Sequence, residues 1–539
     1  MIMTGVPHQL PLSSGDREST LDRLTREEFD LLVIGGGING AGIARDAAMR
    51  GVRTALVEKG DFASGTSSKS SKLIHGGVRY LQHGQFHLVH VACRERDLLR
   101  RRLAPHLVKP LAFVFPVYRG DPVGIVALGI GMWLYDLLAA FRNIERHRMF
   151  SRARTLSLEP ALRSEGLRGA ALYYDCFTDD ARLTLETILA AKEEGAVVAN
   201  YIELRSFLKD GGRIVGAMLA DRVGGTVIRV RARCVVNATG PWTDHVRRLD
   251  DPASKPCLRV TKGVHIIVPR DRVGNRQAIV MHSPRDKRVL FAIPWGTHDL
   301  IGTTDTDFHG SPDNVSADRD DIDYLIDSTN WFFPQANLGT ADVISTYAGL
   351  RPLVAAGENE SPSAVSREEE IFESPSGLIT LAGGKLTTYR SIAHEITDLV
   401  AKRLGVRKAR RKSDRTRAKP LPGGCSEDPD RIVDELVARN GHDLTREQLL
   451  HLAQRYGSRT PEVLALARTQ EEFKRGLVPG MPDIWAEAAY AVKTEMALQP
   501  DDILLRRTNI GLKVPAEAAQ VAENLKENLP NLRNGGTSS

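Results

Sequence analysis

A glycine-rich turn near the N-terminus holds the first residues whose spacing indicates a chemical role. Gly35, Gly37 and Gly40 form a GxGxxG pattern between a predicted strand that begins at Phe29 and a helical stretch, IARDAAMRG. The first glycine permits a tight turn, the second lets the backbone approach a pyrophosphate, and the third lets the helix pack on the strand. Glu58 ends the next strand, TALVEKG, where its carboxylate can accept hydrogen bonds from a ribose. The unit predicts a dinucleotide site.

Two later segments could complete this site, although neither is diagnostic alone. The apolar strand CVVNATG ends at Gly240, and the strand GLITLAGG runs into residues 383–385, GGK. A helix that begins there would direct backbone N–H groups at a developing negative charge, such as a reduced flavin carries. The GxGxxG unit leaves FAD and NAD open, and the two later segments together favour FAD.

The elements that must position these residues divide the chain into regions. Residues 1–28 are expected to be a flexible lead-in, and residues 29–405 combine strand and helix patterns. Residues 406–425 are predicted to be a solvated basic linker, since KARRKSDRTRAK is followed there by PLPGG. Residues 426–528 have helical periodicity without strand signals and predict a small helical domain. Residues 529–539 are expected to be a disordered tail.

Composition limits the class of protein. The 539 residues include 73 Lys plus Arg and 67 Asp plus Glu, for a net charge of +6, and 42% are hydrophobic. Such a chain can bury a core, and the mild positive charge suits an anionic substrate or an anionic lipid surface. The basic run 408–419 has no interleaved aromatic residue, so no nucleic-acid partner is expected. Five scattered cysteines and a polar N-terminus favour a cytoplasmic protein without a disulfide framework or a metal site.

One apolar stretch, residues 122–141, is long enough to cross a membrane. It carries Asp136 and three glycines, so a buried or interfacial helix is expected instead of a span. The arginine-rich segment that follows, residues 141–154, could rest on anionic lipid as a basic amphipathic element. A charged helix end that packs on the protein is the alternative.

Residues 65–81, GTSSKSSKLIHGGVRYL, resemble the signature of the FAD-dependent (aerobic, quinone-linked) glycerol-3-phosphate dehydrogenases. The same family is echoed in NATGPW, KGVHIIVP, IPWG, IGTTDTD, YAGLRPL and GGKLTTYR. The likeness runs from about residue 29 to residue 400, and the tail resembles the C-terminal helical domain of the family.

The resemblance implies an α/β (α+β) fold with three parts. These are an FAD-binding Rossmann-like domain of the D-amino-acid-oxidase/glutathione-reductase-2 type assembled from separated segments, an antiparallel-sheet substrate domain, and a C-terminal helical domain. It also implies oxidation of sn-glycerol 3-phosphate to dihydroxyacetone phosphate, with hydride transfer from C2 to flavin N5 and electrons passed to a membrane quinone. A homodimer, associated peripherally with the inner face of the cell membrane, is expected.

The resemblance also assigns site residues. Arg79, Tyr80, His265, Arg351 and Arg367 are expected to bind the substrate, and guanidinium groups match phosphate oxygens bidentately. The general base is left open between His265, Arg351 and Lys385, which are the candidate catalytic residues. The expected FAD-binding residues are Gly35, Gly37, Asn39, Gly40, Glu58, Thr66, Ser67, Ser71, Lys72, His75, Gly240, Gly384, Lys385, Leu386 and Thr387.

Two other kinds of function are compatible with these motifs. Another flavin enzyme of the same fold, such as a glycerol-3-phosphate oxidase that uses O2 or an amino-acid oxidase, would carry similar residues, and residue identity does not separate quinone from oxygen as acceptor. A non-catalytic dinucleotide-binding protein would hold the cofactor, but no polyol phosphate would bleach its flavin absorbance.

Overall fold

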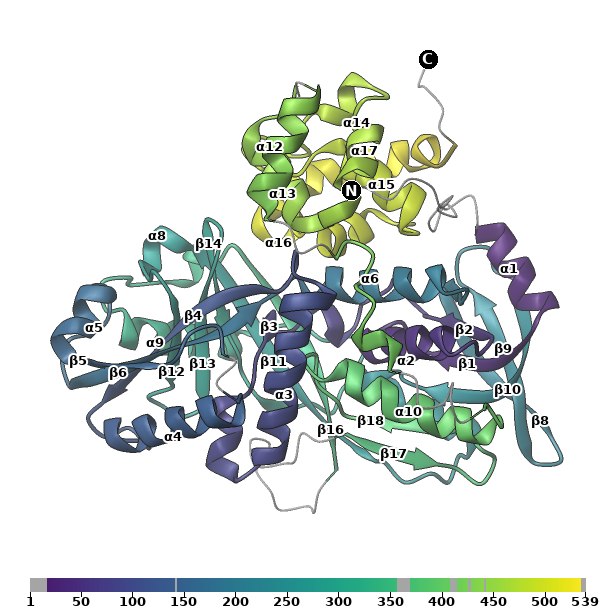
Figure 1. Cartoon of the computed structure of the whole chain (residues 1–539), viewed down its shortest axis with the longest axis horizontal. Coiled ribbons are helices and arrows are strands. Elements are labelled where there is room, and N and C mark those ends of the chain that lie inside the picture. The colour runs from purple at the N-terminus through teal and green to yellow at the C-terminus, as the bar shows by residue number, and fades with distance from the viewer. Residues whose placement is uncertain are drawn as a thin grey trace.

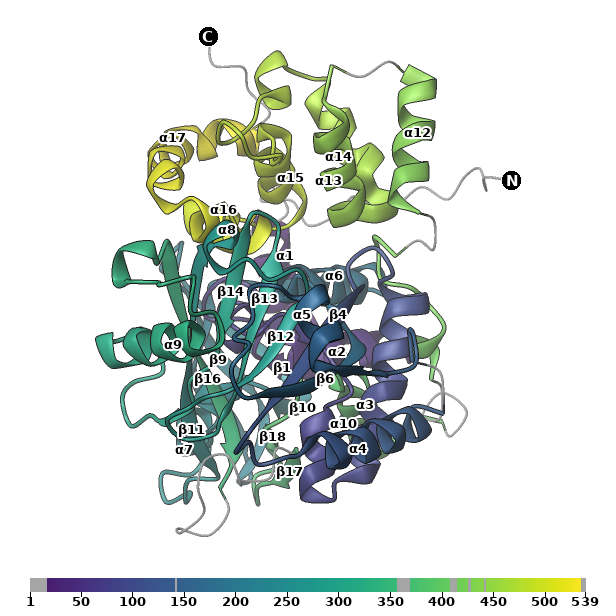
Figure 2. The ribbon, with the colours of Figure 1, turned by 90° about the vertical axis from the view of Figure 1, so that its left-hand side faces the viewer.

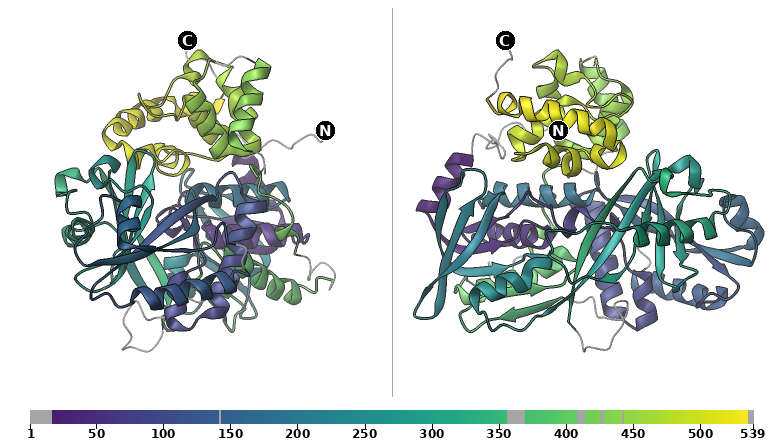
Figure 3. Two further views of the ribbon diagram at one scale, coloured as in Figure 1. Left: turned by 60° about the vertical axis from the view of Figure 1, so that its left-hand side comes forward. Right: turned by 180° about the vertical axis from the view of Figure 1, so that it is seen from behind.

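The structure, a computed structural model, describes residues 17–140, 143–355, 369–407, 414–424, 428–440 and 443–534. Two β-sheets lie side by side along the long axis of the molecule, and a group of C-terminal helices stands on one side of both (Figure 1). Figures 2 and 3 show the same helices standing on the sheet region from other directions. The predicted α/β (α+β) architecture with a C-terminal helical part is confirmed.

The first sheet has a parallel core whose strands come from distant parts of the chain. Its order is β17-β18-β10-β1-β2-β7, and β10 also pairs with the β8–β9 hairpin. The pairs β18–β10, β10–β1, β1–β2 and β2–β7 are parallel. The bounds are β1 Glu28–Ile34, β2 Thr54–Val57, β7 Val197–Ala199, β8 Ile202–Asp210, β9 Arg213–Asp221, β10 Val227–Asn237, β17 Glu370–Glu373 and β18 Ile379–Ala382.

Both faces of this sheet are buried, which explains the continuous apolar runs of its strands. Leu31 and Val33 of β1 face a core shared with three helices, α2 (Ile38–Met49), α6 (Asp180–Glu193) and α10 (Tyr389–Arg403). Leu32 and Ile34 face the other core, which includes residues of β8, β9 and the N-terminal helix. The side chains of β1 therefore alternate between two cores.

The N-terminal helix corrects the prediction of a flexible lead-in over residues 1–28. α1 (Arg17–Arg26) buries Leu24 against the first sheet. Arg17 forms an ion pair with Asp221 at 2.6 Å and donates to the carbonyl of Asn200 at 2.8 Å. The short polar sequence RESTLDRLTR has two leucines, so its periodicity was too weak to indicate a docked helix. The preceding residues of that lead-in, 1–16, lie outside the described part.

The second sheet is largely antiparallel. Its order is β15-β11-β14-β13-β12-β4-β6-β3, with β16 paired to β11 and β5 paired to β6. The predicted strands at residues 262–270 and 288–296 are β11 and β13. The bounds are β3 Leu73–Ile74, β4 Lys109–Tyr118, β5 Arg148–Ser151, β6 Leu167–Phe177, β11 Leu258–Pro269, β12 Ala278–His282, β13 Val289–Trp295, β14 His298–Gly302, β15 Thr306–Asp307 and β16 Ser345–Val354.

Helices cover this sheet on its two faces. α9 (Arg319–Phe332) packs on one face, while α3 (Phe86–Leu98) and α4 (Ile125–Leu138) belong to the core on the other. Two further helices of this region are α5 Arg152–Leu158 and α8 Arg270–Val273, whereas α7 Thr243–Asp250 packs on the first sheet, where Val246 joins the core of β8 and β9. A π-helical turn, η4 (Leu99–Leu103), continues α3.

The described part of the predicted apolar stretch is residues 122–140. It contains α4, a surface helix of 14 residues, and within the described ranges we find no helix long and apolar enough to cross a membrane. Asp136 of α4 is buried, where it accepts a hydrogen bond from Asn143 at 2.6 Å and pairs with His147 at 2.7 Å. The acidic residue therefore faces the protein, and the opposite face of α4 remains apolar.

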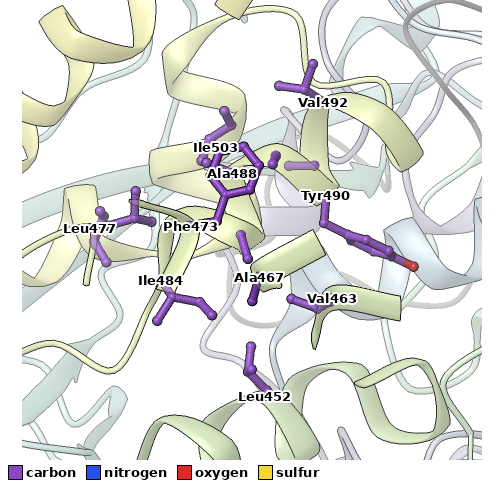
Figure 4. Packing of buried hydrophobic residues seen from close by; sticks show 14 of the residues in the cluster. Leu452, Val463, Ala467, Phe473, Leu477, Ile484, Ala488, Tyr490, Val492 and Ile503 are labelled. Carbon is purple, nitrogen blue, oxygen red and sulfur yellow. The ribbon is translucent and has the colours of Figure 1, made fainter. Parts of the chain in front are cut away.

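The C-terminal helices have their own hydrophobic core, which Figure 4 shows around Phe473, Ile484 and Tyr490. The helices are α12 Pro429–Asn440, α13 Arg446–Tyr456, α14 Thr460–Ala467, α15 Trp485–Thr494, α16 Ile510–Lys513 and α17 Pro515–Asn534. The prediction of a disordered tail over residues 529–539 places its start too early, because α17 continues to Asn534 and buries Leu529 and Leu532.

A buried ion cluster joins the C-terminal helices to the first sheet region. Asp61 binds Arg506 at 2.6 Å and Arg507 at 3.0 Å, while Arg182 of α6 binds Glu495 at 2.5 Å. All five side chains are nearly or fully buried. We call Asp61, Arg182, Glu495, Arg506 and Arg507 the interdomain ion cluster.

The described part of the predicted linker is not solvated along its whole length. In residues 414–424, Arg415 donates to the carbonyl of Met49 at 2.8 Å, and Leu421 is buried. Asp414 pairs with Arg390 of α10 at 2.6 Å. This segment is a strap that lies against α2 and α10, which corrects the prediction of a free linker for these residues.

Candidate functional site

A cavity of about 500 Å³ opens at the carboxyl ends of β1, β10 and β18. Ligands of open parallel sheets bind at this edge. Four segments line most of it: residues 34–39, 58–59, 238–242 and 383–386. These are the GxGxxG turn, the end of β2 and the two later turns that the sequence singled out.

The glycine turn packs at distances that exclude side chains. A Cβ at Gly40 would stand 1.9 Å from the carbonyl oxygen of Gly35, so α2 lies against the turn more closely than any other residue permits. Gly35 itself has φ +112°. Gly37 precedes the first residue of α2, Ile38, whose N–H donates to the Ser67 hydroxyl at 3.0 Å. The N-terminus of α2 lies at the cavity, where a phosphate could accept from its N–H groups.

Glu58 is held at the cavity wall by two backbone donors. Its Oε2 accepts from the N–H of Gly36 at 2.7 Å and its Oε1 accepts from the N–H of Gly60 at 2.9 Å. Burial raises the pKa of Glu58, and the two N–H donors oppose that shift. The carboxylate faces the cavity, in position for a ribose hydroxyl.

The lining fits a dinucleotide such as FAD. Asn39 Oδ1 is buried and has no hydrogen-bond partner among the described residues, while its Nδ2 reaches the carbonyl of Gly383 at 3.5 Å. A buried acceptor without a donor is rare, so a ligand donor is expected beside it. Trp242 lines the same cavity, held by a hydrogen bond to Asp313 at 3.0 Å and by Lys59 over its ring at 4.2 Å.

A second cavity, of about 630 Å³, adjoins the first. Thr66, Ser70, Gly384, Lys385 and Leu386 line both. The end nearest these shared residues is polar. A group bound there would therefore lie beside a cofactor in the first cavity.

Three adjacent strands build the polar end of the second cavity. On β11, His265 lies opposite Gly302 of β14 and Tyr347 of β16. A Cβ at Gly302 would stand 2.2 Å from His265 Cδ2, and a Cβ at Gly263 would stand 2.4 Å from Arg351 Nη2. The two glycines therefore provide the space in which the imidazole and the guanidinium lie.

His265 is buried and neutral at neutral pH. Burial first, and then the positive charges of Arg351 and Lys72, hold the pKa of His265 well below 6.5. Its Nε2 lies 2.9 Å from the Ser71 hydroxyl, and its ring stacks on Tyr347 with centroids 4.8 Å apart. Nδ1 is buried and has no hydrogen-bond partner in the described segments.

Arg351 and Lys385 bring positive charge to the same end. Arg351 donates to the Thr303 hydroxyl at 2.8 Å and pairs with Asp305 at 3.1 Å. Lys385 Nζ lies 4.7 Å from the centre of the Tyr80 ring. The arrangement can hold an anion near a neutral imidazole, next to the first cavity.

The predicted site residues fall into two groups. The first cavity is lined by Gly35, Gly37, Asn39, Glu58, Thr66, Ser67, Gly240, Gly384, Lys385 and Leu386. The second is lined by Ser71, His75, Tyr80, His265, Arg351 and Thr387, besides shared residues. Gly40 lines neither, because its role is to let α2 approach the turn. Arg367 lies outside the described residues, and so does the side chain of Arg79.

Lys72 stands apart from the other predicted site residues. Its side chain is buried with Nζ 2.6 Å from Asp180, and it lines neither cavity, so its part in cofactor binding stays a prediction. Lys69 lines the second cavity instead, and sequence reasoning missed it. Burial, with a smaller effect of Arg506, lowers the pKa of Lys69. The two lysines stand three residues apart in one loop, and no sequence signal distinguishes their directions.

Comparison with known proteins agrees with this geometry. The model of the "FAD dependent oxidoreductase" family (DAO) matches residues 30–399, most of the chain. The chain belongs to this family. FAD is therefore its cofactor. The model named "C-terminal domain of alpha-glycerophosphate oxidase" matches residues 414–530.

Individual relatives agree with the family resemblance found in the sequence. An "Aerobic glycerol-3-phosphate dehydrogenase" of Staphylococcus saprophyticus is 38% identical over 506 residues, which cover 93% of this chain and 90% of the relative. The protein of that name from Staphylococcus aureus is 39% identical over 512 residues, with the same coverage of each chain. The solved glycerol-3-phosphate dehydrogenase from Bacillus halodurans, complexed with FAD, is 35% identical, has a TM-score of 0.78 and covers 97% of this chain and 96% of its own. The predicted family is confirmed, and the chain is an FAD-dependent enzyme.

Proposed function

We propose that this enzyme oxidises sn-glycerol 3-phosphate to dihydroxyacetone phosphate and passes the electrons to a membrane quinone. The observation that carries the proposal is the polar end of the second cavity, where Arg351, Lys385 and Lys69 surround a space beside His265. A phosphate dianion fits several cations, and a secondary alcohol fits a neutral imidazole. The names of the relatives support the same substrate.

Arg351 is proposed to bind the substrate phosphate. Its guanidinium is fixed over Gly263 by Thr303 and Asp305, so little side-chain freedom is lost when an anion binds. Arg79 and Arg367, which the family resemblance places in the substrate pocket, stay predictions.

His265 is proposed to accept the proton of the C2 hydroxyl. Arg351 is excluded as the base, because a guanidinium does not give up its proton in proteins. The charge of Arg351 disfavours imidazolium, and the bound phosphate dianion would offset that charge at the moment when His265 must take a proton. FAD, when bound, supplies the acceptor for the hydride of C2. Lys385, which lines both cavities, is proposed to balance negative charge where they meet.

The opposite end of the second cavity is apolar and supports the proposal of a quinone as electron acceptor. Its walls include Leu81, Phe86, Phe115, Val123, Ala127 and Leu134. This end lies at α4, on the molecular surface, so an apolar quinone could approach the cofactor region from there. Peripheral attachment to the inner face of the cell membrane through this side of the molecule is part of the proposal. A homodimer stays a prediction.

Oxygen is the competing acceptor, because the C-terminal family model is named for an oxidase. Anaerobic mixing of the purified holoenzyme with glycerol 3-phosphate should bleach the flavin, and glycerol should act far more slowly. Failure of glycerol 3-phosphate to bleach the flavin would refute the proposed substrate.

A short-chain quinone should then reoxidise the flavin faster than air does. One peroxide per turnover, with no acceleration by quinone, would favour the oxidase.

A pair of variants on one helix tests the quinone path. Leu134→Glu places a charge in the apolar end of the second cavity, whereas Val126→Glu places the same charge on the outside of the same helix. Leu134→Glu should slow reoxidation by the soluble quinone and spare flavin reduction, and Val126→Glu should leave both unchanged. Equal effects of the two variants would contradict the path.

A further inference from the structure

His265, the proposed base, has almost no surface of its own in the second cavity, because the residue is only 2% exposed. Gly302 lies against one edge of the ring, where a Cβ would stand 2.2 Å from Cδ2 and 2.8 Å from Nε2. Tyr347 stacks on the ring with centroids 4.8 Å apart. Nδ1 is buried and finds no hydrogen-bond partner among the described residues. A substrate hydroxyl therefore cannot reach Nδ1, and Nε2 is the nitrogen left to take a proton.

The hydroxyl of Ser71 stands at this nitrogen. Its Oγ lies 2.9 Å from His265 Nε2. Ser71 lines the second cavity and is partly exposed, unlike the imidazole behind it. Within the described ranges, this hydroxyl makes no other hydrogen bond. A serine hydroxyl has one donor and two acceptor positions, so a bond to Nε2 leaves room for a donor that enters from the cavity.

The loop that carries Ser71 is fixed on both sides of it. The Ser70 hydroxyl donates to Asp180 Oδ2 at 2.7 Å, and Lys72 Nζ pairs with Asp180 Oδ1 at 2.6 Å. The Tyr347 hydroxyl donates to the carbonyl of Ser70 at 2.7 Å. Lys72 has φ +57°, a left-handed conformation that a residue with a side chain keeps only where its surroundings hold it. The buried Lys72–Asp180 pair, which lines neither cavity, therefore fixes the position of Ser71.

We propose that Ser71 is a catalytic residue that passes the proton of the substrate C2 hydroxyl to His265. The inference rests on the proposed function, in which His265 is the base. The C2 hydroxyl donates to Ser71 Oγ, and the Ser71 hydroxyl donates to Nε2. When the hydride leaves C2 for the bound cofactor, the C2 hydroxyl proton moves to Oγ and the Oγ proton moves to Nε2. The substrate becomes a ketone, Ser71 is again a hydroxyl, and His265 becomes imidazolium.

The charges around the ring are compatible with this relay. The Ser71–His265 bond forms with either imidazole tautomer, because a hydroxyl can donate or accept; the relay uses the tautomer with its proton on Nδ1. Arg351 and Lys72 are the cations that lower the pKa of His265, after burial. Asp180 balances the charge of Lys72, and the substrate phosphate would balance that of Arg351. After the product leaves, the same hydroxyl returns the proton to water in the cavity.

Stopped-flow reduction of the FAD-bound full chain by glycerol 3-phosphate tests the relay. Ser71→Ala should lower the limiting rate of flavin bleaching by about a hundredfold or more. The half-saturating substrate concentration should stay nearly unchanged, because the phosphate contacts remain. Ser71→Thr keeps the hydroxyl and should react much faster than Ser71→Ala. The control Ser376→Ala removes a hydroxyl that donates to Asp250 at 2.7 Å and lines neither cavity, so it should react as the wild type does.

Visible absorbance at equal protein checks that each variant retains its flavin. Equal limiting rates in the wild type and Ser71→Ala, or equal slowing in Ser71→Ala and Ser71→Thr, would overturn the relay.

A proton inventory on the wild type tests the relay without any variant. The limiting rate of bleaching is measured in mixtures of H2O and D2O at a pH where the rate does not change with pH. The relay moves two protons, so the rate should fall along a curve that bows downward as the fraction of D2O rises. A straight line of any slope would overturn the relay. Failure of glycerol 3-phosphate to bleach the wild-type flavin would instead refute the proposed substrate, whereas rapid bleaching with a straight inventory would refute the relay alone.

Discussion

Gly263→Ala is expected to disable the proposed phosphate site without changing a charged residue. Gly263 lies on β11 beneath the guanidinium of Arg351, and a Cβ there would stand 2.4 Å from Nη2 and 2.7 Å from Cζ. Contacts this short do not occur, so the guanidinium must move away. Its bonds to Thr303 and Asp305, at 2.8 and 3.1 Å, cannot both survive that movement. An alanine is otherwise well tolerated at this position, because Gly263 does not have a left-handed backbone conformation.

The size of the effect follows from the bonds at stake. A hydrogen bond to a charged group contributes about 1.5–3 kcal/mol. If the displaced guanidinium no longer reaches the phosphate, kcat/KM for glycerol 3-phosphate should fall by about ten- to a hundredfold. Glycerol lacks the phosphate, so its low rate should change little, and the preference for the phosphorylated substrate should shrink by the same factor.

Stopped-flow bleaching of the flavin by both substrates checks this, in wild type, Gly263→Ala, Arg351→Ala and the double variant. The double variant should be no slower than Arg351→Ala, because the two changes remove one interaction. Gly129→Ala on α4, whose Cβ would meet only Met149 at an ordinary 3.8 Å, is the control and should behave as wild type. If Gly263→Ala slowed both substrates equally, Arg351 would not be a phosphate ligand.

Three further predictions concern the cofactor, the interdomain contact and pH. Gly40→Ala should lose flavin, seen as loss of visible absorbance at equal protein, because its Cβ would stand 1.9 Å from Gly35 oxygen; full flavin occupancy would contradict the turn geometry. Removal of residues from 428 onward should abolish soluble flavoprotein, since Asp61 would lose Arg506 and Arg507, Arg182 would lose Glu495, and the first-sheet core would lose Met496. A soluble yellow fragment would refute this. The pKa of His265 in the folded state is lowered from 6.5, so kcat/KM should fall only below pH 6.5. The folded state should also lose stability as the pH falls below 6.5, because the unfolded chain binds the proton more tightly there. A pH profile whose acid limb lies above 6.5 would count against His265 as the base.

The local pattern of the chain was enough to predict the βαβ unit, the strands β11 and β13 and the helical C-terminal region. Their hydrophobic periodicity is a property of neighbouring residues, and neighbouring residues are what a sequence displays. The GxGxxG turn is of the same kind, because Gly35, Gly37 and Gly40 serve a single turn. The signature over residues 65–81 indicated the family for the same reason.

Contacts between distant segments were decided only by the tertiary structure. Lys69 and Lys72 have the same chemistry in the same loop, yet Lys72 turns to Asp180, more than a hundred residues away, while Lys69 turns to the second cavity. The position of Arg351 depends on the absence of a side chain at Gly263, on another strand. No local pattern records either fact.

The helices at the edges of the fold show the same division between local and distant information. The composition of α4 indicated an apolar helix, but the burial of Asp136 against Asn143 and His147, which leaves one clean apolar stripe outside, required the packed neighbours. The sequence of α1 is too polar to predict docking, which depends on an ion pair with Asp221 across the first sheet region. Sequence by itself therefore determined the family, the cofactor class and the local elements, because these depend on residues close together in the chain. Which side chains face the cavities, the outer surface of α4 and the interdomain ion cluster was decided by tertiary packing, because burial and charge pairing join residues that the chain keeps far apart.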